Sequence, residues 1–418
     1  MPIARSSRRK FPVAAAISLF IASLAASALA HAQVHPASPA SKSSSASSSF
    51  QSLATQAAAA QEAQQFDKAV LLFRKALALR PTWAEGWWSL GTIYYDNDRF
   101  ASAANAFQHV IALNPKHGTA HAMLGLCQFE LGQDASALRN IEASKVLGID
   151  EDPQLRQVVL FHEGVLLQRA GRFETAQMAL SSLCLSGVRS DELTKTFGMV
   201  ALRMRDMAPP SAGSETADIV EHVGQGACFS AQKDYEAARR EFEFVIAKYP
   251  HYSRIHYAYG RSLLDAHETA LAIQQFQQEI AESPSSVLAR LQIASAEYKV
   301  DTAAGLPYAE DAVRIAPQMP FAHYLLGLLL LDKGEYAKAI PHLEIARKAF
   351  PQEAKIYWSL SSAYTHTGRL QDAAQARADF ARLSKTSGNT PGSANSSSDQ
   401  SAAPNMAITD NFAGEPRQ

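Results

Sequence analysis

Prolines recur at a nearly constant spacing along most of this chain. The local spacings are 34, 34, 33 and 34 residues, and the prolines concerned are Pro81, Pro115, Pro250, Pro284, Pro317 and Pro351. A fixed period of roughly 20 to 50 residues is typical of chains built from repeated supersecondary units. The spacing therefore favours a stack of similar repeats over a single globular core.

Two further positions recur when the repeats are aligned on these prolines. The eighth position is glycine in six of nine repeats: Gly91, Gly125, Gly164, Gly226, Gly260 and Gly327. The twentieth position is alanine in eight repeats: Ala69, Ala103, Ala137, Ala176, Ala238, Ala272, Ala339 and Ala373. Such small residues let two helices approach each other closely, so both positions are expected at a helix–helix contact.

Each repeat contains two stretches with helical spacing of apolar residues, and its turn often carries glycine followed by a large apolar residue, as in Gly171-Arg172-Phe173. Proline at the end stops the second helix because it lacks an N–H group and clashes with the preceding turn. A lone helical hairpin cannot bury both of its faces. The pattern therefore predicts an all-α solenoid of stacked hairpins.

The second repeat carries the motif that identifies a family. Its residues Trp87, Leu90-Gly91, Tyr94, Ala103, Phe107 and Pro115 match the tetratricopeptide repeat signature in order. The chain resembles that family over roughly residues 50–385. The resemblance implies a right-handed α-α superhelical solenoid in which the first helix of each hairpin lines a concave face.

The repeat pattern is interrupted twice. Gly125 and Gly164 are 39 residues apart, and residues 188–218 contain one helix-like stretch, Asp191 to Met207, before Pro209-Pro210. The sequence predicts repeats 1–4 at 50–187, a degenerate repeat or hinge at 188–218 without a second helix, and repeats 5–9 at 219–385. The geometry of the seventh repeat is left open because Pro307 falls near its second helix.

The two ends of the chain differ from the repeats in composition. Residues 1–32 combine Arg5, Arg8, Arg9 and Lys10 with an apolar stretch that ends at Ala30-His31-Ala32, as expected of a signal peptide. Residues 33–49 are predicted to form a Ser/Ala-rich linker and residues 386–418 a disordered tail. The protein is therefore expected to be exported, periplasmic or secreted, and the alternative is an inner-membrane anchor formed by an uncleaved N-terminal segment.

Charge and motifs argue against several classes of function. The chain has 39 basic and 40 acidic residues, so it lacks the surplus of positive charge that binding to nucleic acid requires. No phosphate-binding loop, nucleophile elbow or metal-ligand motif is present, which predicts a non-enzyme without cofactor or metal. His121, His222, His256 and His323 all stand at position four and are expected to be structural. His117 is expected to precede its helix, which argues against a metal site with His121.

The three cysteines are predicted to be buried free thiols. Cys127 and Cys228 share one repeat position in distant repeats, and Cys184 lies in a second helix. A disulfide needs α-carbons within about 7 Å, which repeats this far apart are not expected to provide.

Large aromatic side chains on the predicted inner face suggest a binding surface. The family's groove positions hold Trp88, Tyr95, Phe129, Phe161, Tyr257, Tyr324 and Trp358, and Arg254 and Arg261 flank Tyr257 as a cationic patch. The family's carboxylate clamp is absent, since Trp88 and Thr92 occupy its positions. The chain is therefore predicted to be a non-catalytic scaffold of the cell envelope that binds a peptide or a partner protein. The alternative is glycan or small-ligand binding in the same groove.

Overall fold

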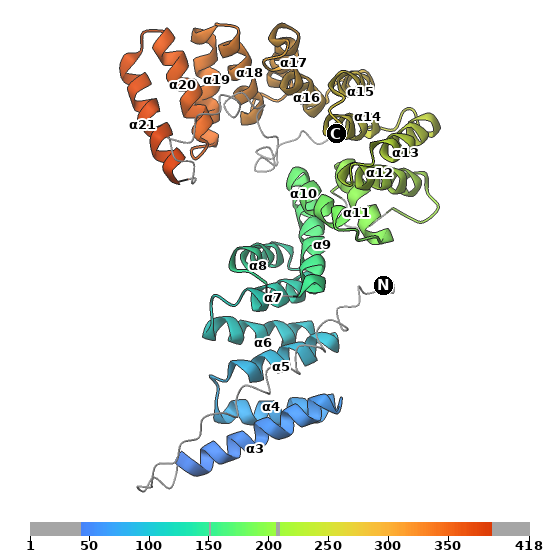
Figure 1. Cartoon of the computed structure of the whole chain (residues 1–418), viewed down its shortest axis with the longest axis vertical. Helices are drawn as coiled ribbons and strands as arrows, with labels where there is room; N and C mark the ends of the chain where they lie inside the picture. Colours follow the sequence, from blue (N-terminus) through green and yellow to red (C-terminus); the bar gives the residue numbers. More distant parts are fainter. Residues whose placement is uncertain (1–42, 150–151, 206–209, 387–418) are drawn as a thin grey trace, which may run out of the picture. The chain divides into compact units, whose positions relative to one another are not determined.

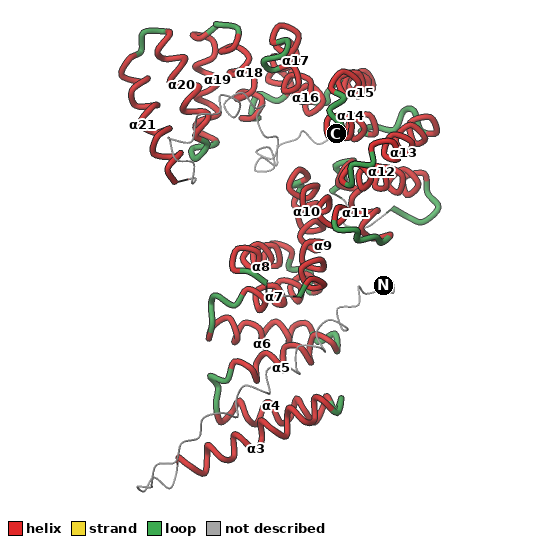
Figure 2. Tube along the Cα trace, in the orientation of Figure 1, coloured by secondary structure: helices red, strands yellow, loops and turns green. Residues whose placement is uncertain are grey.

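The computed structural model describes residues 43–149, 152–205 and 210–386, and all regular structure in these ranges is α-helical (Figures 1 and 2). The predicted signal segment and nearly all of the predicted C-terminal tail lie outside the described residues. The chain divides into two compact units between Leu167 and Gln168, a boundary inside α9 rather than in the predicted hinge at 188–218. Each unit is described separately below.

The N-terminal unit consists of consecutive helices that pair as hairpins. The pairs are α3 with α4, α5 with α6, and α7 with α8. The helix bounds are α3 (Ser43–Glu62), α4 (Phe66–Leu79), α5 (Ala84–Asp96), α6 (Phe100–Leu113), α7 (Gly118–Glu130), α8 (Asp134–Leu147) and α9 (Pro153–Ala170), the last of which crosses into the next unit. Helix α3 begins at Ser43, so part of the segment predicted as a linker is helical.

The C-terminal unit continues the hairpins after an irregular region. Five pairs follow one another: α12 with α13, α14 with α15, α16 with α17, α18 with α19, and α20 with α21. The bounds are α10 (Phe173–Leu185), α11 (Asp191–Ala201), α12 (Glu215–Ala231), α13 (Tyr235–Lys248), α14 (Ile255–Asp265), α15 (Thr269–Glu282), α16 (Val287–Glu297), α17 (Thr302–Ile315), α18 (Pro320–Asp332), α19 (Tyr336–Ala349), α20 (Ala354–His366) and α21 (Leu370–Thr386). Pro307 lies within α17, so the seventh repeat keeps both helices.

The repeated glycines and alanines lie at the helix–helix contacts, as predicted. A Cβ atom added to Gly91 would lie 2.7 Å from the ring of Phe107, and one added to Gly260 would lie 2.5 Å from that of Phe276. The alanines at position twenty are buried. The residue four positions after each of seven of these alanines is large and at most 2% exposed: Phe73, Phe107, Ile141, Leu180, Phe242, Phe276 and Leu343. In the hairpins that contain Gly91, Gly125, Gly226, Gly260 and Gly327, a small residue therefore faces a large one.

The single helix of the degenerate repeat is shorter than its sequence suggests. Helix α11 ends at Ala201, because Arg203 adopts a left-handed conformation with φ of 55°. The N–H of Arg203 then donates to Val200 O at 2.9 Å and that of Met204 to Met199 O at 2.8 Å. These two hydrogen bonds form a Schellman-type helix end.

Helix α11 has a helical partner, although the degenerate repeat contains no second helix of its own, as the sequence predicts. It packs against α12, which also forms a hairpin with α13. The contact is closest where Gly198 and Gly224 meet. A Cβ atom on Gly198 would lie 1.9 Å from Val220 O, and one on Gly224 would lie 2.0 Å from Thr194 O. Helix α12 therefore belongs to two helix pairs at once.

Replacing Gly198 with alanine should separate α11 from α12. The atom that the new methyl group meets is a backbone carbonyl oxygen, which cannot rotate away as a side chain could. Overpacking of this kind costs about 1–3 kcal/mol, and urea denaturation followed by circular dichroism would measure it. Lys195→Ala is the control, because Lys195 is exposed on the same helix. Equal stability of the two variants would contradict the tight contact.

Candidate protein-binding site

The side chain at position four joins several repeats to the repeat that precedes them. In four repeats its ring bonds to the carbonyl oxygen of the proline six residues earlier. The bonds are Trp87 Nε1 to Pro81 O at 2.8 Å, His121 Nε2 to Pro115 O at 3.3 Å, His323 Nε2 to Pro317 O at 3.0 Å, and Tyr357 OH to Pro351 O at 3.0 Å. Histidine thus takes the place of a large aromatic residue at this position, which agrees with the predicted structural role.

The Nδ1 atom of each position-four histidine bonds to position twenty-three of the same repeat. The pairs are His121 with Asn140 at 2.9 Å, His222 with Glu241 at 2.7 Å, His256 with Gln275 at 2.7 Å, and His323 with His342 at 2.8 Å. His117 precedes α7 as predicted, and its Nδ1 accepts a hydrogen bond from the Ala120 N–H. Among the described residues no three His, Cys, Asp or Glu side chains gather where they could hold a metal ion.

The predicted groove residues of the N-terminal unit are aromatic side chains that are partly exposed to solvent. Trp88, Tyr95, Phe129 and Phe161, here called the aromatic row, are all partly exposed and come from the first helices α5, α7 and α9. Trp88 packs edge-on against Phe107 with ring centroids 5.3 Å apart, and its other contact is a stack on His117 at 5.4 Å. The indole is therefore held in place while part of it faces solvent.

Neighbouring side chains also hold the remaining members of the aromatic row. Phe129 and Phe161 contact the ring of His162 edge-on, at centroid distances of 4.6 and 5.6 Å. Tyr95 contacts Phe100 at 5.5 Å. Burial raises the pKa of the Tyr95 hydroxyl, and nearby Cys127 and Glu130 raise it further. Tyr95 is therefore an uncharged hydrogen-bonding group at any physiological pH.

In the C-terminal unit two predicted groove residues lie in the core instead. Tyr257 is 4% exposed and Tyr324 is 3% exposed, so the expectation that their rings face a partner was wrong. Tyr257 packs against Phe276 at 5.9 Å, and its hydroxyl accepts a hydrogen bond from Gln292 at 3.4 Å. Position five in α14 and α18 is covered by neighbouring helices. Only Trp358, 45% exposed and in contact with Phe380, presents a large surface there.

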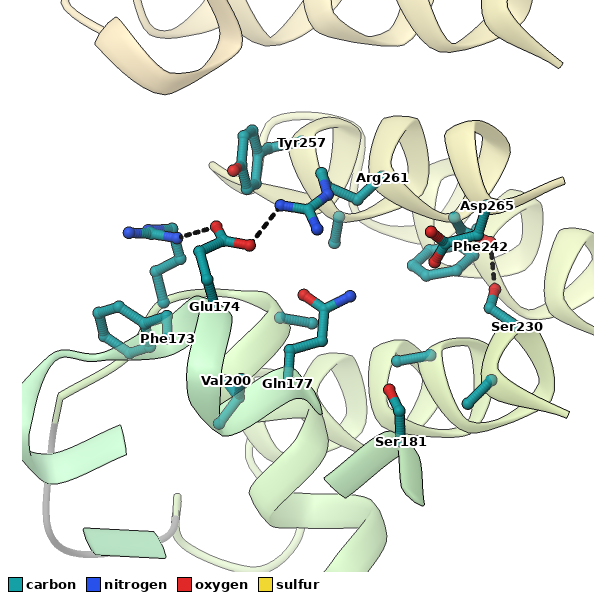
Figure 3. A pocket seen from close by; sticks show the side chains of 16 residues that line it. Phe173, Glu174, Gln177, Ser181, Val200, Ser230, Phe242, Tyr257, Arg261 and Asp265 are labelled. Carbon is teal, nitrogen blue, oxygen red and sulfur yellow. Dashed lines mark hydrogen bonds and ion pairs between the residues drawn. The ribbon is translucent and has the colours of Figure 1, made fainter. Parts of the chain in front are cut away.

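Arg261 belongs to a buried ionic triad rather than to an open cationic patch (Figure 3). Glu174 in α10 accepts hydrogen bonds from Arg203 Nη1 at 2.9 Å and from Arg261 Nη1 at 2.5 Å. The side chains of Glu174, Arg203 and Arg261 are only 6%, 8% and 21% exposed. The triad connects α10, the end of α11 and α14.

The ionisation of the triad and the small cavity beside it both indicate that the triad holds helices together and does not bind a ligand. Burial would raise the pKa of Glu174, but the guanidinium groups of Arg261 and Arg203 outweigh burial and hold that pKa below its usual range. The attraction of Glu174 also raises the pKa of Arg261 despite its burial. The cavity beside the triad encloses about 30 Å³, which is room for about two water molecules and not for a sugar ring.

Arg254 makes structural contacts as well. Its guanidinium Nη1 donates to the carbonyl oxygens of Arg203 at 2.9 Å and Leu202 at 3.3 Å. Its backbone N–H donates to Glu279 Oε2 at 3.0 Å. The patch predicted around Tyr257 is therefore a set of links between α11, α14 and α15.

Cys184 and Cys228 form a disulfide, which corrects the prediction of three free thiols. Their α-carbons are 5.5 Å apart, within the range that a disulfide requires. The two cysteines meet because α11 is a single helix, so that α10 comes into direct contact with α12. Cys127 is a buried free thiol as predicted, and burial raises its pKa to about 12.

Comparison with solved structures found several similar chains. They include two crystal structures of MamA, at 20% and 21% identity, which align with 41% and 39% of this chain and 93% and 96% of their own, each with a TM-score of 0.37. Another is a tetratricopeptide repeat protein from Parabacteroides merdae ATCC 43184, at 13% identity, over 68% of this chain and 99% of that one, with a TM-score of 0.32. No curated protein matches the chain in sequence.

The family model described as tetratricopeptide repeat matches four segments of the sequence. They are residues 55–104, 89–144, 229–287 and 324–384, which together make up half of the chain. These segments coincide with hairpins of both units. The chain belongs to the tetratricopeptide repeat family.

Proposed function

We propose that this protein is a non-catalytic scaffold that binds a peptide segment or a partner protein through the aromatic row of its N-terminal unit. Tetratricopeptide repeats are protein-interaction modules, so a protein partner follows from the family. We choose this surface because partly exposed aromatic rings recur on the successive first helices α5, α7 and α9. Large, rigid aromatic side chains dominate the energetics of protein interfaces.

The contrast between the two units supports this choice. In the C-terminal unit the aromatic rings at position five of α14 and α18 are buried, and the two arginines beside Tyr257 already have partners within the fold. In the N-terminal unit the rings of the aromatic row are fixed by their neighbours and still partly accessible. A surface that is ordered before binding loses little side-chain entropy when a partner docks.

We also propose that the protein works outside the reducing cytoplasm. The basic and apolar N-terminal segment supports export, and the Cys184–Cys228 disulfide suits an oxidising compartment. Among the helices of the described residues, none combines the length and the apolar character needed to cross a membrane.

Thiol labelling tests the oxidising location. Because Cys184 and Cys228 are bonded and Cys127 is buried, labelling of the protein isolated from intact cells should modify Cys127 alone, and only after denaturation. Labelling of all three cysteines would contradict an oxidising location.

The test of the binding surface is photo-crosslinking in intact cells followed by measurement of affinity. A photoreactive amino acid at position 88 or 129 should capture a partner protein, and the purified partner should bind the full chain. Trp88→Ala and Phe129→Ala should each weaken that binding about tenfold or more without altering the circular dichroism spectrum.

Phe244→Ala is the matched control, because Phe244 is 47% exposed but lies on the second helix α13. Its affinity for the partner should equal that of the parent. Parent-like binding by both Trp88→Ala and Phe129→Ala would show that the aromatic row is not the binding surface. Saturable thermal stabilisation by a glycan, lost in Trp88→Ala, would favour carbohydrate binding instead.

A further inference from the structure

A second concave surface lies in the N-terminal unit, and none of the four residues of the aromatic row lines it. It is a groove of about 690 Å³ between α4, α5 and α6, whose positions Figure 1 shows. Its floor is formed by buried apolar and aromatic side chains, namely Leu77, Leu90, Tyr94 and Ala106. Ligand sites commonly enclose about 300–1,000 Å³, so this groove is large enough for several residues of an extended peptide.

A small residue, Ala106, forms part of the lining of the groove. In four other repeats, position twenty-three carries a polar side chain that bonds to the histidine at position four, as in His121 with Asn140. In this repeat, position twenty-three is Ala106, and position four is Trp87. Alanine is too short to bond to the tryptophan across the hairpin, and both residues line the groove.

The aromatic walls of the groove are held in fixed positions. Trp87 is anchored by its hydrogen bond to Pro81 O at 2.8 Å and by stacking on His109, with ring centroids 3.9 Å apart and planes inclined by 13°. The guanidinium carbon of Arg99 lies 4.6 Å from the centre of the Tyr94 ring, a cation–π contact. The groove therefore needs little rearrangement to receive a ligand.

The charged residues that line the groove are both positive. Its charged lining residues are Arg74 on α4 and Arg99 at the start of α6, and both are exposed. Helix α6 itself contains no aspartate, glutamate, lysine or arginine. Neither Arg74 nor Arg99 forms an ion pair with an aspartate or glutamate of the described residues. A ligand that brings carboxylates would therefore find two guanidinium groups available.

We propose that this groove binds an extended segment of a partner protein in which an aromatic or large aliphatic side chain is flanked by aspartate or glutamate. The apolar side chain packs on Leu90 and Tyr94, and the flanking carboxylates pair with Arg74 and Arg99. Arginine suits this role because its planar guanidinium group forms two parallel hydrogen bonds with a carboxylate. This site is separate from the aromatic row, so one protein can bind two partner segments at the same time.

The test uses a fluorescein-labelled octapeptide of alternating glutamate and phenylalanine, with a control peptide in which lysine replaces glutamate. Fluorescence anisotropy with the full chain should show saturable binding of the acidic peptide and none of the basic one. Arg74→Glu and Arg99→Glu should each weaken binding about tenfold or more. Ala106→Asn, which partly fills the groove, should also weaken it while the circular dichroism spectrum stays unchanged.

Two control variants separate this site from general charge effects and from the aromatic row. Lys75→Glu makes the same change of charge on an exposed residue of α4 that does not line the groove, and it should alter the affinity less than about twofold. Trp88→Ala, which alters the aromatic row, should leave octapeptide binding unchanged. The proposal fails if the basic peptide binds equally well, if Lys75→Glu weakens binding as much as Arg74→Glu, or if Arg74→Glu and Arg99→Glu bind like the parent. Loss of octapeptide binding in Trp88→Ala would place the ligand on the aromatic row and also overturn it.

Discussion

Replacing Glu174 with glutamine should lower the free energy of unfolding of the C-terminal unit by about 3–5 kcal/mol. Glutamine keeps the size of the side chain but removes its charge, so Arg203 and Arg261 would remain buried without the carboxylate to which both of them bond. Removing one partner of a buried ion pair lowers the free energy of unfolding strongly for this reason, even where the intact pair itself adds little to stability. Urea denaturation of the full chain, followed by far-ultraviolet circular dichroism, measures the change.

Glu268→Gln provides the matched control for this variant. Glu268 pairs with Arg239 at 2.8 Å in the same unit, but the two side chains are 32% and 29% exposed. A pair this accessible to water contributes less than about 1 kcal/mol. Equal losses of stability in Glu174→Gln and Glu268→Gln would mean that burial does not strengthen the triad.

The triad should also make stability depend on pH. The folded-state pKa of Glu174 lies below its value in the unfolded chain. Its contribution is therefore complete above the unfolded pKa and is lost as the pH falls toward the folded pKa. The decline in stability below the usual glutamate pKa should be shallower in Glu174→Gln than in the parent, and identical acid profiles would contradict a depressed pKa.

Reducing the Cys184–Cys228 disulfide should destabilise the C-terminal unit by about 2–4 kcal/mol. The bond joins residues 44 positions apart, so it restricts the unfolded chain over the whole of α11. A disulfide also holds α10 against α12 at the one place where the regular repeat is interrupted. A reducing agent should accordingly lower the denaturation midpoint of the parent protein.

The variant Cys228→Ala should show the same loss of stability without any reducing agent. Adding the reducing agent to this variant should then have no further effect, which separates cleavage of this bond from other effects of the reagent. An unchanged midpoint in the reduced parent protein would show that the bond contributes nothing to stability.

The regular part of the fold could be predicted from the sequence because its contacts are local. Gly260 meets Phe276 within one hairpin, and His256 meets Gln275 within the same hairpin. Both contacts recur at fixed distances along the chain, so the same spacing appears in repeat after repeat. The sequence repeat therefore predicts where the helices lie and where they approach each other closely. It also predicts that the position-four histidines have a structural role.

The irregular region could not be predicted in this way, because its contacts join distant segments. Glu174 and Arg261 are 87 positions apart, and their meeting depends on how α11 packs against α12. That packing has no counterpart elsewhere in the sequence from which to infer it. The burial of Tyr257 and the pairing of Cys184 with Cys228 depend on the same arrangement.

The groove between α4 and α6 was missed for a different reason. The groove positions of the family lie on the first helices, whereas Arg74, Arg99 and Ala106 lie on or next to the second helices. A signal was present in the sequence: position twenty-three is alanine where other repeats carry a polar partner for position four. This difference between repeats becomes meaningful only once the hydrogen bond between positions four and twenty-three is known.

Helix α12 limits how this protein can have changed during evolution. Repeat arrays commonly lengthen or shorten by gain or loss of a whole hairpin, because each hairpin contacts only its neighbours. Deleting α12 with α13 would instead leave α11 without the glycine-lined surface against which it packs, and would remove half of the disulfide. Duplication and deletion are therefore expected among the other hairpins, whereas the segment from α10 to α14 is expected to be gained or lost only as a whole.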